Sequence, residues 1–311
     1  MLSRVADSIF WMARYMERTN GMLRMLRTNY VASQSEVRGF SWRSVLQTYG
    51  DIKPEEITVI EFSSQKVLEH LLHDRENVNS AFNNITQARE NARAAQDHIT
   101  KEVWQCLNEY YHLIRDKQIE EQVIYGDPLT ALDILIRHGM MYHGTVDITM
   151  ARGEGFNFLN IGKFLERAIL SADMIHIKLA EMNYHLQHPS EAPQWRYLLY
   201  SLSGYEFYLK TYRGNMQPDH VLHQVLYNNL FPHSVLYCLQ QVSRYFERLK
   251  SESLPENYNK LEFLVGRATN NVKYSNPQAN ETESLRQLLR QTRTELVEIS
   301  TAFSQYYFGY S

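Results

Sequence analysis

The chain opens with MLSRVADSIFWMARYMERTN (residues 1–20), a stretch whose apolar side chains return every three or four residues. The apolar stripe contains Ile9, Met12, Ala13, Met16, Leu23 and Leu26. This spacing matches the 3.6-residue turn of an α-helix, so it predicts a long amphipathic helix near the start of the chain. Ser3 occupies the position of a helix N-cap.

Helical patterns of the same kind cover most of the remaining sequence. They occupy residues 40–49, 64–73, 80–115, 128–151, 156–186, 194–212, 219–227, 234–251, 257–274 and 283–308. Asp127 and Pro128 are residue types preferred at the N-cap and at the first helical position. Residues 51–63 show no decisive period, so a loop, a short strand and a helix start all stay open. With 13 Gly and 8 Pro among 311 residues, the sequence predicts an all-α protein.

Charge and composition argue against a nucleic-acid-binding protein, a membrane protein and a secreted protein. The formal net charge is −3, without the clustered basic excess expected of a nucleic-acid-binding protein. No uncharged apolar run is long enough to span a membrane, so no membrane association is predicted. Charged side chains interrupt residues 1–20, which excludes a signal peptide. Cys106 and Cys238 lie in separate apolar helical patterns, so we predict free thiols and a reducing, cytoplasmic location.

Three landmarks recur in the same order, at offsets of 149, 153 and 154 residues. Tyr15-Met16-Glu17-Arg18 corresponds to Phe164-Leu165-Glu166-Arg167, Trp42-Arg43-Ser44-Val45-Leu46 to Trp195-Arg196-Tyr197-Leu198-Leu199, and Ser80-Ala81-Phe82 to Ser234-Val235-Leu236. We therefore expect two duplicated halves, residues 1–150 and 151–311, packed together as a helical bundle. Bundles hold sites between facing helices, which makes the seam between the halves a candidate location.

Each predicted half opens on a helix that carries a Glu-Arg pair. Arg18 follows Tyr15 by one turn, and Arg167 follows Phe164 by one turn, on largely apolar helix faces. We expect both arginines to be shielded from water and paired, because an unpaired buried charge is costly. The interpretation we favour is an interhelical ion pair that fixes the packing. The alternative is a polar pocket that binds an anionic group through the planar guanidinium.

The glutamates lie on a different stripe of the same helices. Arg14 precedes Glu17 by three residues and is its expected partner, and Lys163 holds the same place before Glu166. Two further polar clusters are Arg89-Glu90 with Arg93, where a solvated face is the favoured interpretation, and the Arg152-to-Gly155 turn. The candidate polar-site residues are Arg14, Glu17, Arg18, Arg89, Glu90, Arg93, Arg152, Glu154, Lys163, Glu166 and Arg167.

The sequence carries no motif for a nucleophile, a phosphate loop or a zinc protease. Histidine pairs with a three-residue spacing are His70 and His73, His185 and His188, and His220 and His223. A metal site needs further ligands that these pairs do not bring. We therefore predict neither a metal nor a cofactor.

Several segments together resemble one family. They are MLSRVADSIFWMARYMERTN, ARENARA (residues 88–94), Asp147-x-Thr149-Met150 with Glu154-Gly155, GKFLERA (residues 162–168) and FPHSVLYCL (residues 231–239). In this order they resemble the bacterial Alpha-E family, named for a predicted α-helical domain with an ER motif. Lys163 and His233 stand where the family usually has arginine.

The resemblance implies a setting in peptide synthesis or modification, beside circularly permuted ATP-grasp ligases and transglutaminase-like peptidases. Our leading hypothesis is a non-catalytic helical partner or accessory subunit of such a system. The rival hypothesis is an enzyme or small-ligand binding protein with a Glu-Arg pocket at the seam. In that case Glu17 or Glu166 is the general base, and Arg18 or Arg167 holds an anionic substrate.

Overall fold

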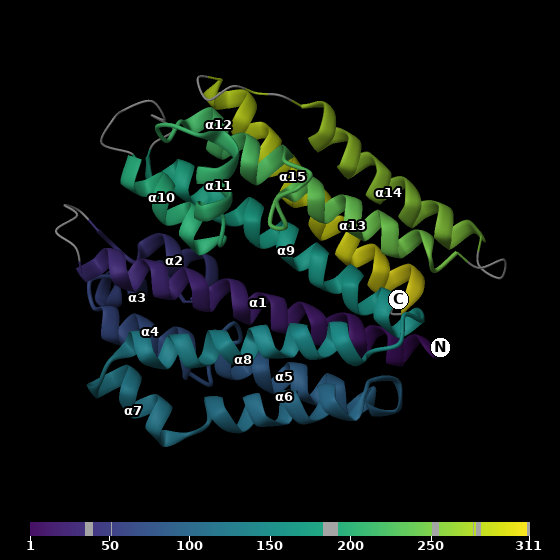
Figure 1. Cartoon of the computed structure of the whole chain (residues 1–311), viewed down its shortest axis with the longest axis horizontal. Coiled ribbons are helices and arrows are strands. Elements are labelled where there is room, and N and C mark those ends of the chain that lie inside the picture. The colour runs from purple at the N-terminus through teal and green to yellow at the C-terminus, as the bar shows by residue number, and fades with distance from the viewer. Residues whose placement is uncertain are drawn as a thin grey trace. The chain divides into compact units, whose positions relative to one another are not determined.

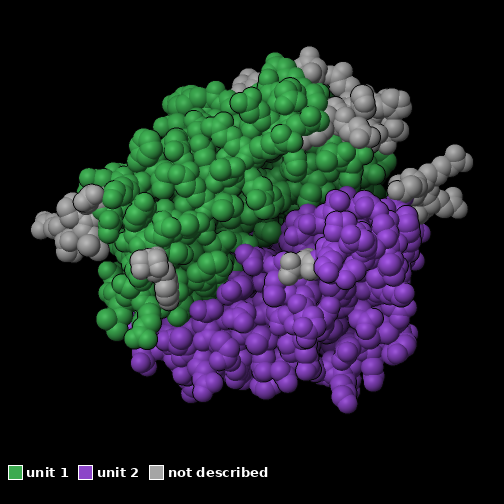
Figure 2. All heavy atoms as spheres, turned by 180° about the vertical axis from the view of Figure 1, so that it is seen from behind, with its two compact units in different colours: residues 1–14, 152–311 green, residues 15–151 purple. Residues whose placement is uncertain are grey.

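The computed structural model describes residues 1–34, 40–50, 52–182, 192–250, 255–275, 277 and 281–309. All regular elements among these residues are helices, which confirms the predicted all-α class (Figure 1). The chain forms two compact units, coloured separately in Figure 2. Unit 1 contains Met1–Arg14 and Arg152–Ser311, and unit 2 contains Tyr15–Ala151. The boundary falls inside α1 (Ser3–Gln34), whereas the duplicated halves 1–150 and 151–311 stay a prediction.

Unit 2 continues from α1 through seven further α-helices of the described residues. These are α2 (Arg43–Tyr49), α3 (Pro54–Ile60), α4 (Ser64–Leu72), α5 (Ala81–Ala94), α6 (Lys101–Ile114), α7 (Lys117–Tyr125) and α8 (Pro128–Thr149). α6 packs against both α5 and α8, and α7 packs against α4 and α8. Leu68, Ile85, Leu107 and Leu132 are fully buried in this unit. Burying each such side chain contributes roughly 1.5–3 kcal/mol.

Local sequence explains where several helices of unit 2 begin. The Asp127 carboxylate accepts from the backbone N–H groups of Leu129 and Thr130, so the predicted cap of α8 is confirmed. Within the unassigned stretch 51–63, residues Pro54–Ile60 form α3, with Pro54 in the first turn. The continuous pattern over 80–115 is broken after Ala94 by a 3₁₀ turn, Gln96–His98.

Unit 1 is built around the long helix α9 (Glu154–Glu181), which packs against α13 (Val235–Glu247) and α15 (Thr282–Ala302). α14 (Pro255–Tyr274) packs against α13 and α15, and Figure 1 shows these four helices side by side. The shorter elements are α10 (Ala192–Ser201), α11 (Tyr205–Tyr212), α12 (Pro218–Leu222) and two π-helical turns, His223–Tyr227 and Phe303–Tyr307.

The pattern over 194–212 predicts one helix, but the structure breaks it between α10 and α11. Ser203 has a positive φ of 54°. A Cβ on Gly204 would lie 2.6 Å from Gln224 Nε2 and 2.7 Å from Phe231 Cζ. The close approach of these distant side chains therefore requires glycine at the break.

The third landmark of the predicted repeat has the same local role in both places. The Ser80 hydroxyl accepts from Asn83 N–H at the start of α5, and the Ser234 hydroxyl accepts from Tyr237 N–H at the start of α13. Both serines are fully buried. A serine at the N-cap position explains this shared hydrogen bond in both helices. The duplication of the two halves itself stays a prediction.

Among the described residues, no helix has the length and apolar character needed to cross a membrane. Some features predicted from the sequence lie outside the described residues. They are the histidines His185 and His188, the end of the 156–186 helix beyond residue 182, and the last residue of the 234–251 helix.

Candidate functional site

A deeply buried ion pair of unit 1 joins Arg14 on α1 to Glu166 on α9. Arg14 Nε donates to Glu166 Oε2 at 2.7 Å, and Arg14 Nη1 donates to the hydroxyl of Ser300 on α15. The two charged side chains are 7% and 3% exposed. The guanidinium also lies 4.4 Å from the ring centroid of Trp11. This pair holds the first turns of α1 to α9 and α15, because neither charge is stable there without its partner.

The other glutamate, Glu17, belongs to a polar cluster inside unit 2. Glu17 Oε2 lies 3.5 Å from His143 Nε2 on α8. The same imidazole nitrogen lies 2.8 Å from the side-chain nitrogen of Asn20. A Cβ on Gly139 would lie 1.7 Å from Asn20 Oδ1, so this glycine makes room for the Asn20 side chain. The cluster fixes how the later part of α1 lies against α8.

In both Glu-Arg pairs the glutamate is the buried member, since Glu17 and Glu166 are each only 2% exposed. That Arg18 and Arg167 are shielded and paired stays a prediction: both side chains are partly exposed, and Arg167 Nη1 donates to the Pro232 carbonyl oxygen at 3.5 Å. Arg18 Cζ lies 5.7 Å from the Tyr15 ring centroid, and Arg167 Cζ lies 5.3 Å from that of Phe164. A long arginine side chain can cover a ring with its stem and still bring its guanidinium to water.

The arginine at position 14 has a partner that its own helix does not supply. The spacing predicts Glu17 for this role, whereas the contact described above is made to the glutamate of the second Glu-Arg pair. Lys163, expected beside Glu166, lies with its ammonium 4.5 Å from the Phe164 ring centroid. Helical spacing alone could not anticipate a contact between residues 152 positions apart.

The remaining candidates lie in separate places. Arg152 Cζ lies 4.1 Å from the Phe156 ring centroid, and Glu154 accepts from the Met1 ammonium at 2.7 Å. In unit 2, Glu90 pairs with Arg89 at 2.7 Å and lies 3.8 Å from Arg93. Unit 1 thus contains Arg14, Arg152, Glu154, Lys163, Glu166 and Arg167, and unit 2 contains Glu17, Arg18, Arg89, Glu90 and Arg93. A pocket at a seam between halves stays a prediction.

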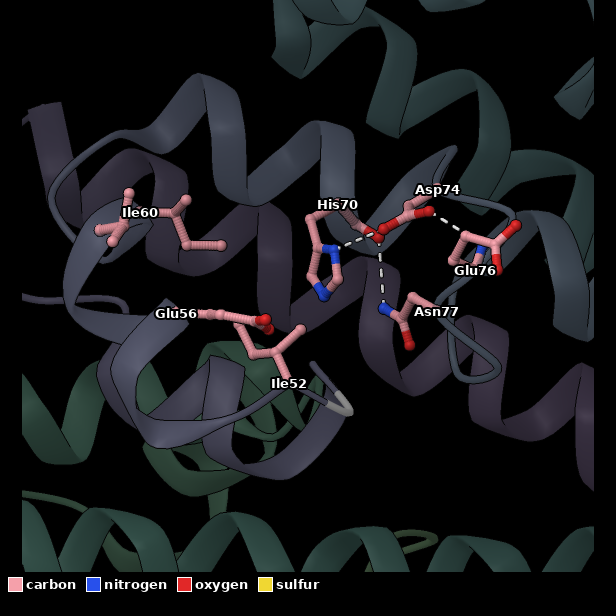
Figure 3. A pocket seen from close by; sticks show the side chains of 8 residues that line it. Ile52, Glu56, Ile60, His70, Asp74, Glu76 and Asn77 are labelled. Atoms are coloured by element: carbon pink, nitrogen blue, oxygen red, sulfur yellow. Dashed lines mark hydrogen bonds and ion pairs between the residues drawn. The ribbon is translucent and has the colours of Figure 1, made fainter.

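A pocket of about 480 Å³ opens in unit 2, and none of these candidates lines it (Figure 3). It is lined by Ile52, Glu56, Val59, Ile60, His70, Asp74, Glu76 and Asn77. His70 Nδ1 lies 2.7 Å from Asp74 Oδ2, and His70 Nε2 lies 2.7 Å from the Gly50 carbonyl oxygen. The Asn77 amide donates to the carbonyls of Tyr49 and His70. These polar groups tie α2, α4 and the loop after α4 together, which is a structural role.

Sequence reasoning missed His143, Asn20 and Ser300 as partners of the charged residues. His143 has no second histidine three or four residues away, so the sequence did not single it out as a candidate site residue. Gly139, one turn before His143, is the only local hint of a close helix contact. Among the described residues, no group of three or more His, Cys, Asp or Glu side chains could hold a metal ion.

Neither cysteine thiol is expected to react while the protein is folded. Burial raises the pKa of the Cys106 thiol to about 11, so little of the reactive thiolate is present near neutral pH. Cys238 is fully buried, with its sulfur 3.6 Å from the Pro232 carbonyl oxygen. With Ellman's reagent at about pH 8, we expect both thiols to react only after urea is added. Rapid release of one equivalent from the native protein would contradict this and reveal an accessible nucleophile.

Comparison with known proteins gives one match. The Alpha-E family profile, described as a predicted alpha-helical domain with a conserved ER motif, matches residues 1–308. No curated protein and no solved structure matches the chain. The match covers both Glu-Arg helices and all the helices described above.

Proposed function

The chain belongs to the Alpha-E family, and from this we propose that it is a non-catalytic helical partner, or accessory subunit, of a bacterial peptide-ligating system. The partners are a circularly permuted ATP-grasp ligase and a transglutaminase-like peptidase. The helical bundle contributes a binding surface, and the ligase or peptidase carries out the chemistry in a cytoplasmic complex. No metal or cofactor of its own takes part in this role.

The burial and pairing of the two glutamates carries this proposal. Glu17 and Glu166 are the carboxylates of the Glu-Arg pairs, and each is 2% exposed. Glu166 is held by Arg14 at 2.7 Å, and Glu17 lies 3.5 Å from His143. A general base must reach its substrate within hydrogen-bond distance. Carboxylates enclosed between packed helices are suited to holding those helices in register, which favours a structural role for the motif.

Co-purification with the ligase tests the proposal directly. The chain and a circularly permuted ATP-grasp ligase from the same source would be mixed at about 10 μM, well above a Kd of 1 μM for a specific complex. We expect them to co-elute in size-exclusion chromatography, with ATP or without it. The transglutaminase-like peptidase serves as a second partner in a parallel run. Separate elution in every combination would rule out the accessory-subunit role.

The partial exposure of Arg18 and Arg167 favours a second candidate, a small-ligand binding protein. Each guanidinium lies over an aromatic ring, at 5.7 and 5.3 Å from the centroid, and each arginine is partly exposed as a residue. A guanidinium can hold a carboxylate or a phosphate through two parallel hydrogen bonds. A thermal-shift screen with amino acids, short peptides and nucleotides separates the two candidates. A ligand whose stabilising effect disappears in Arg18→Ala would favour this second function.

A further inference from the structure

Arginine and aromatic side chains alternate along one side of the α5–α6 pair in unit 2. In order they are Arg75, Phe82, Arg115, Tyr111, Arg89 and Trp104, a set we call the arginine–aromatic row. Figure 1 shows α5 and α6 next to each other. Phe82 lies near the end of α6 and Arg89 lies near its middle, so the two helices run antiparallel. The row therefore combines residues from both helices and from the loop before α5.

Each guanidinium of the row lies against at least one ring. Arg75 Cζ is 5.1 Å from the Phe82 centroid, and Arg115 Cζ is 5.7 Å from the same centroid. Arg115 Cζ is also 5.0 Å from the Tyr111 centroid, and Arg89 Cζ is 4.5 Å from it. Contact with a ring restricts the flexible arginine side chain in advance, so less conformational entropy is lost when the guanidinium binds a ligand.

The arginines of the row differ in how far their charge is neutralised. Arg89 donates to Glu90 at 2.7 Å and to Asn108 at 2.8 Å. Arg75 and Arg115 are exposed, and within the described residues neither has a carboxylate within 4.0 Å. Arg115 donates one N–H group to the Tyr111 hydroxyl at 2.7 Å, which leaves its other N–H groups available.

Three acidic residues flank Arg75 and Arg115 in the sequence: Asp74 and Asp116 have other partners, and Glu76 is exposed with its carboxylate more than 4.0 Å from the Arg75 guanidinium. Asp74 accepts from His70 Nδ1 at 2.7 Å. Asp116 caps α7 by accepting from the backbone N–H of Gln118 at 2.9 Å. Asp74 and Asp116 are therefore engaged elsewhere, and the guanidiniums of Arg75 and Arg115 remain open to an external acceptor.

We propose that the arginine–aromatic row binds the carboxylates of an acidic peptide segment through Arg75 and Arg115. Both guanidiniums flank the same ring, Phe82, so they present two anchored donors to one extended ligand. A carboxylate approaches a guanidinium along its N–H edge, which contact with a ring face leaves open. Two acidic side chains of one peptide can thus be held at the same time.

The same geometry disfavours a single-stranded nucleic acid. Binding of that kind relies on uncovered aromatic faces on which bases stack. Phe82 is only 8% exposed and carries two guanidiniums, and Tyr111 also carries two. The rings of the row thus serve as supports for arginine, and a ligand meets the N–H groups first.

Peptide binding by the arginine–aromatic row requires neither the ligase nor the peptidase, so it can be measured with the chain alone. Fluorescein-labelled hexaglutamate is titrated with the full chain at low salt, and binding is followed by fluorescence anisotropy. We expect binding that weakens about tenfold in the double variant Arg75→Gln/Arg115→Gln, since both charge-assisted contacts are lost. Arg137→Gln is the matched control, because this exposed arginine lies on α8 outside the row, and we expect a change of about twofold or less.

Circular dichroism and urea melts establish that each variant is folded. The single variants Arg75→Gln and Arg115→Gln each leave one guanidinium on Phe82, and each should weaken binding about threefold if the two contacts contribute equally. Absence of hexaglutamate binding at millimolar protein would overturn the proposal, as would equal weakening in Arg137→Gln. Tighter binding of inorganic phosphate or of oligothymidylate, with the same dependence on Arg75 and Arg115, would overturn it in favour of a phosphate ligand.

Discussion

Replacing Arg14 by alanine is expected to lower the free energy of unfolding by about 3–5 kcal/mol, the range for removing one partner of a buried ion pair. The substitution removes the Arg14 guanidinium from the Glu166 carboxylate, which is only 3% exposed. It also removes the guanidinium from the Trp11 ring and from the Ser300 hydroxyl. Urea melts of the full chain measure the loss.

Two further variants separate the buried charge from other effects. Arg18→Ala removes an arginine of the same helix that is only partly buried, and it should cost about 1 kcal/mol or less. The double variant Arg14→Met/Glu166→Leu removes both charges while keeping apolar volume, and it should recover most of the loss. If Arg14→Ala costs less than about 1 kcal/mol, the scale of an exposed pair, the structural role of this pair is refuted.

Replacing Gly162 by alanine is expected to destabilise unit 1 by about 3 kcal/mol, near the top of the usual range for overpacking a core. A Cβ at this position of α9 would lie 2.4 Å from the backbone oxygen of Phe10 on α1. A backbone atom cannot rotate away as a side chain can, so the two helices must separate. This movement would disturb the packing of the Phe10 ring on Phe303 and Phe308, whose centroids lie 5.6 and 5.4 Å from it.

A loss of stability in Gly162→Ala would point to a steric clash, because replacing glycine by alanine within a helix normally raises stability by up to about 1 kcal/mol. Gly266→Ala on α14 is the matched control, since a Cβ added there would meet no atom within 4 Å outside the local helix. It should raise stability by about 0.5–1 kcal/mol. Thermal or urea melts of the two variants should therefore move in opposite directions. A gain in stability for Gly162→Ala would contradict the close helix contact.

The fold was predictable where its signals are local. The N-cap Asp127 and Pro128 define the start of α8, and the apolar period defines α4, α9 and α15. The break between α10 and α11 was not predictable, because the requirement for Gly204 comes from Phe231 and Gln224. Those residues follow Gly204 by 27 and 20 positions, beyond the reach of helical periodicity.

For the candidate site, the sequence predicts which residues are polar positions on the helices, but not which residues they contact. The sequence indicates that Arg14, Glu17 and Glu166 belong to polar positions on two long helices. It does not give their partners, because one helix turn constrains only neighbours three or four residues away. His143 was missed for the same reason, since its approach to Glu17 depends on how α1 and α8 pack.

The division of the chain inside α1 has a consequence for protein synthesis. Residues 1–14 belong to the same unit as α15, although about 290 residues separate Arg14 from the final π-helical turn. At roughly 5–20 residues per second, translation of that interval takes roughly 15–60 s. During this time Phe10 and Arg14 lack Phe303, Phe308 and Ser300, the residues that later enclose them. Unit 1 therefore completes its folding last, and chaperones have longest access to the apolar face that was translated first.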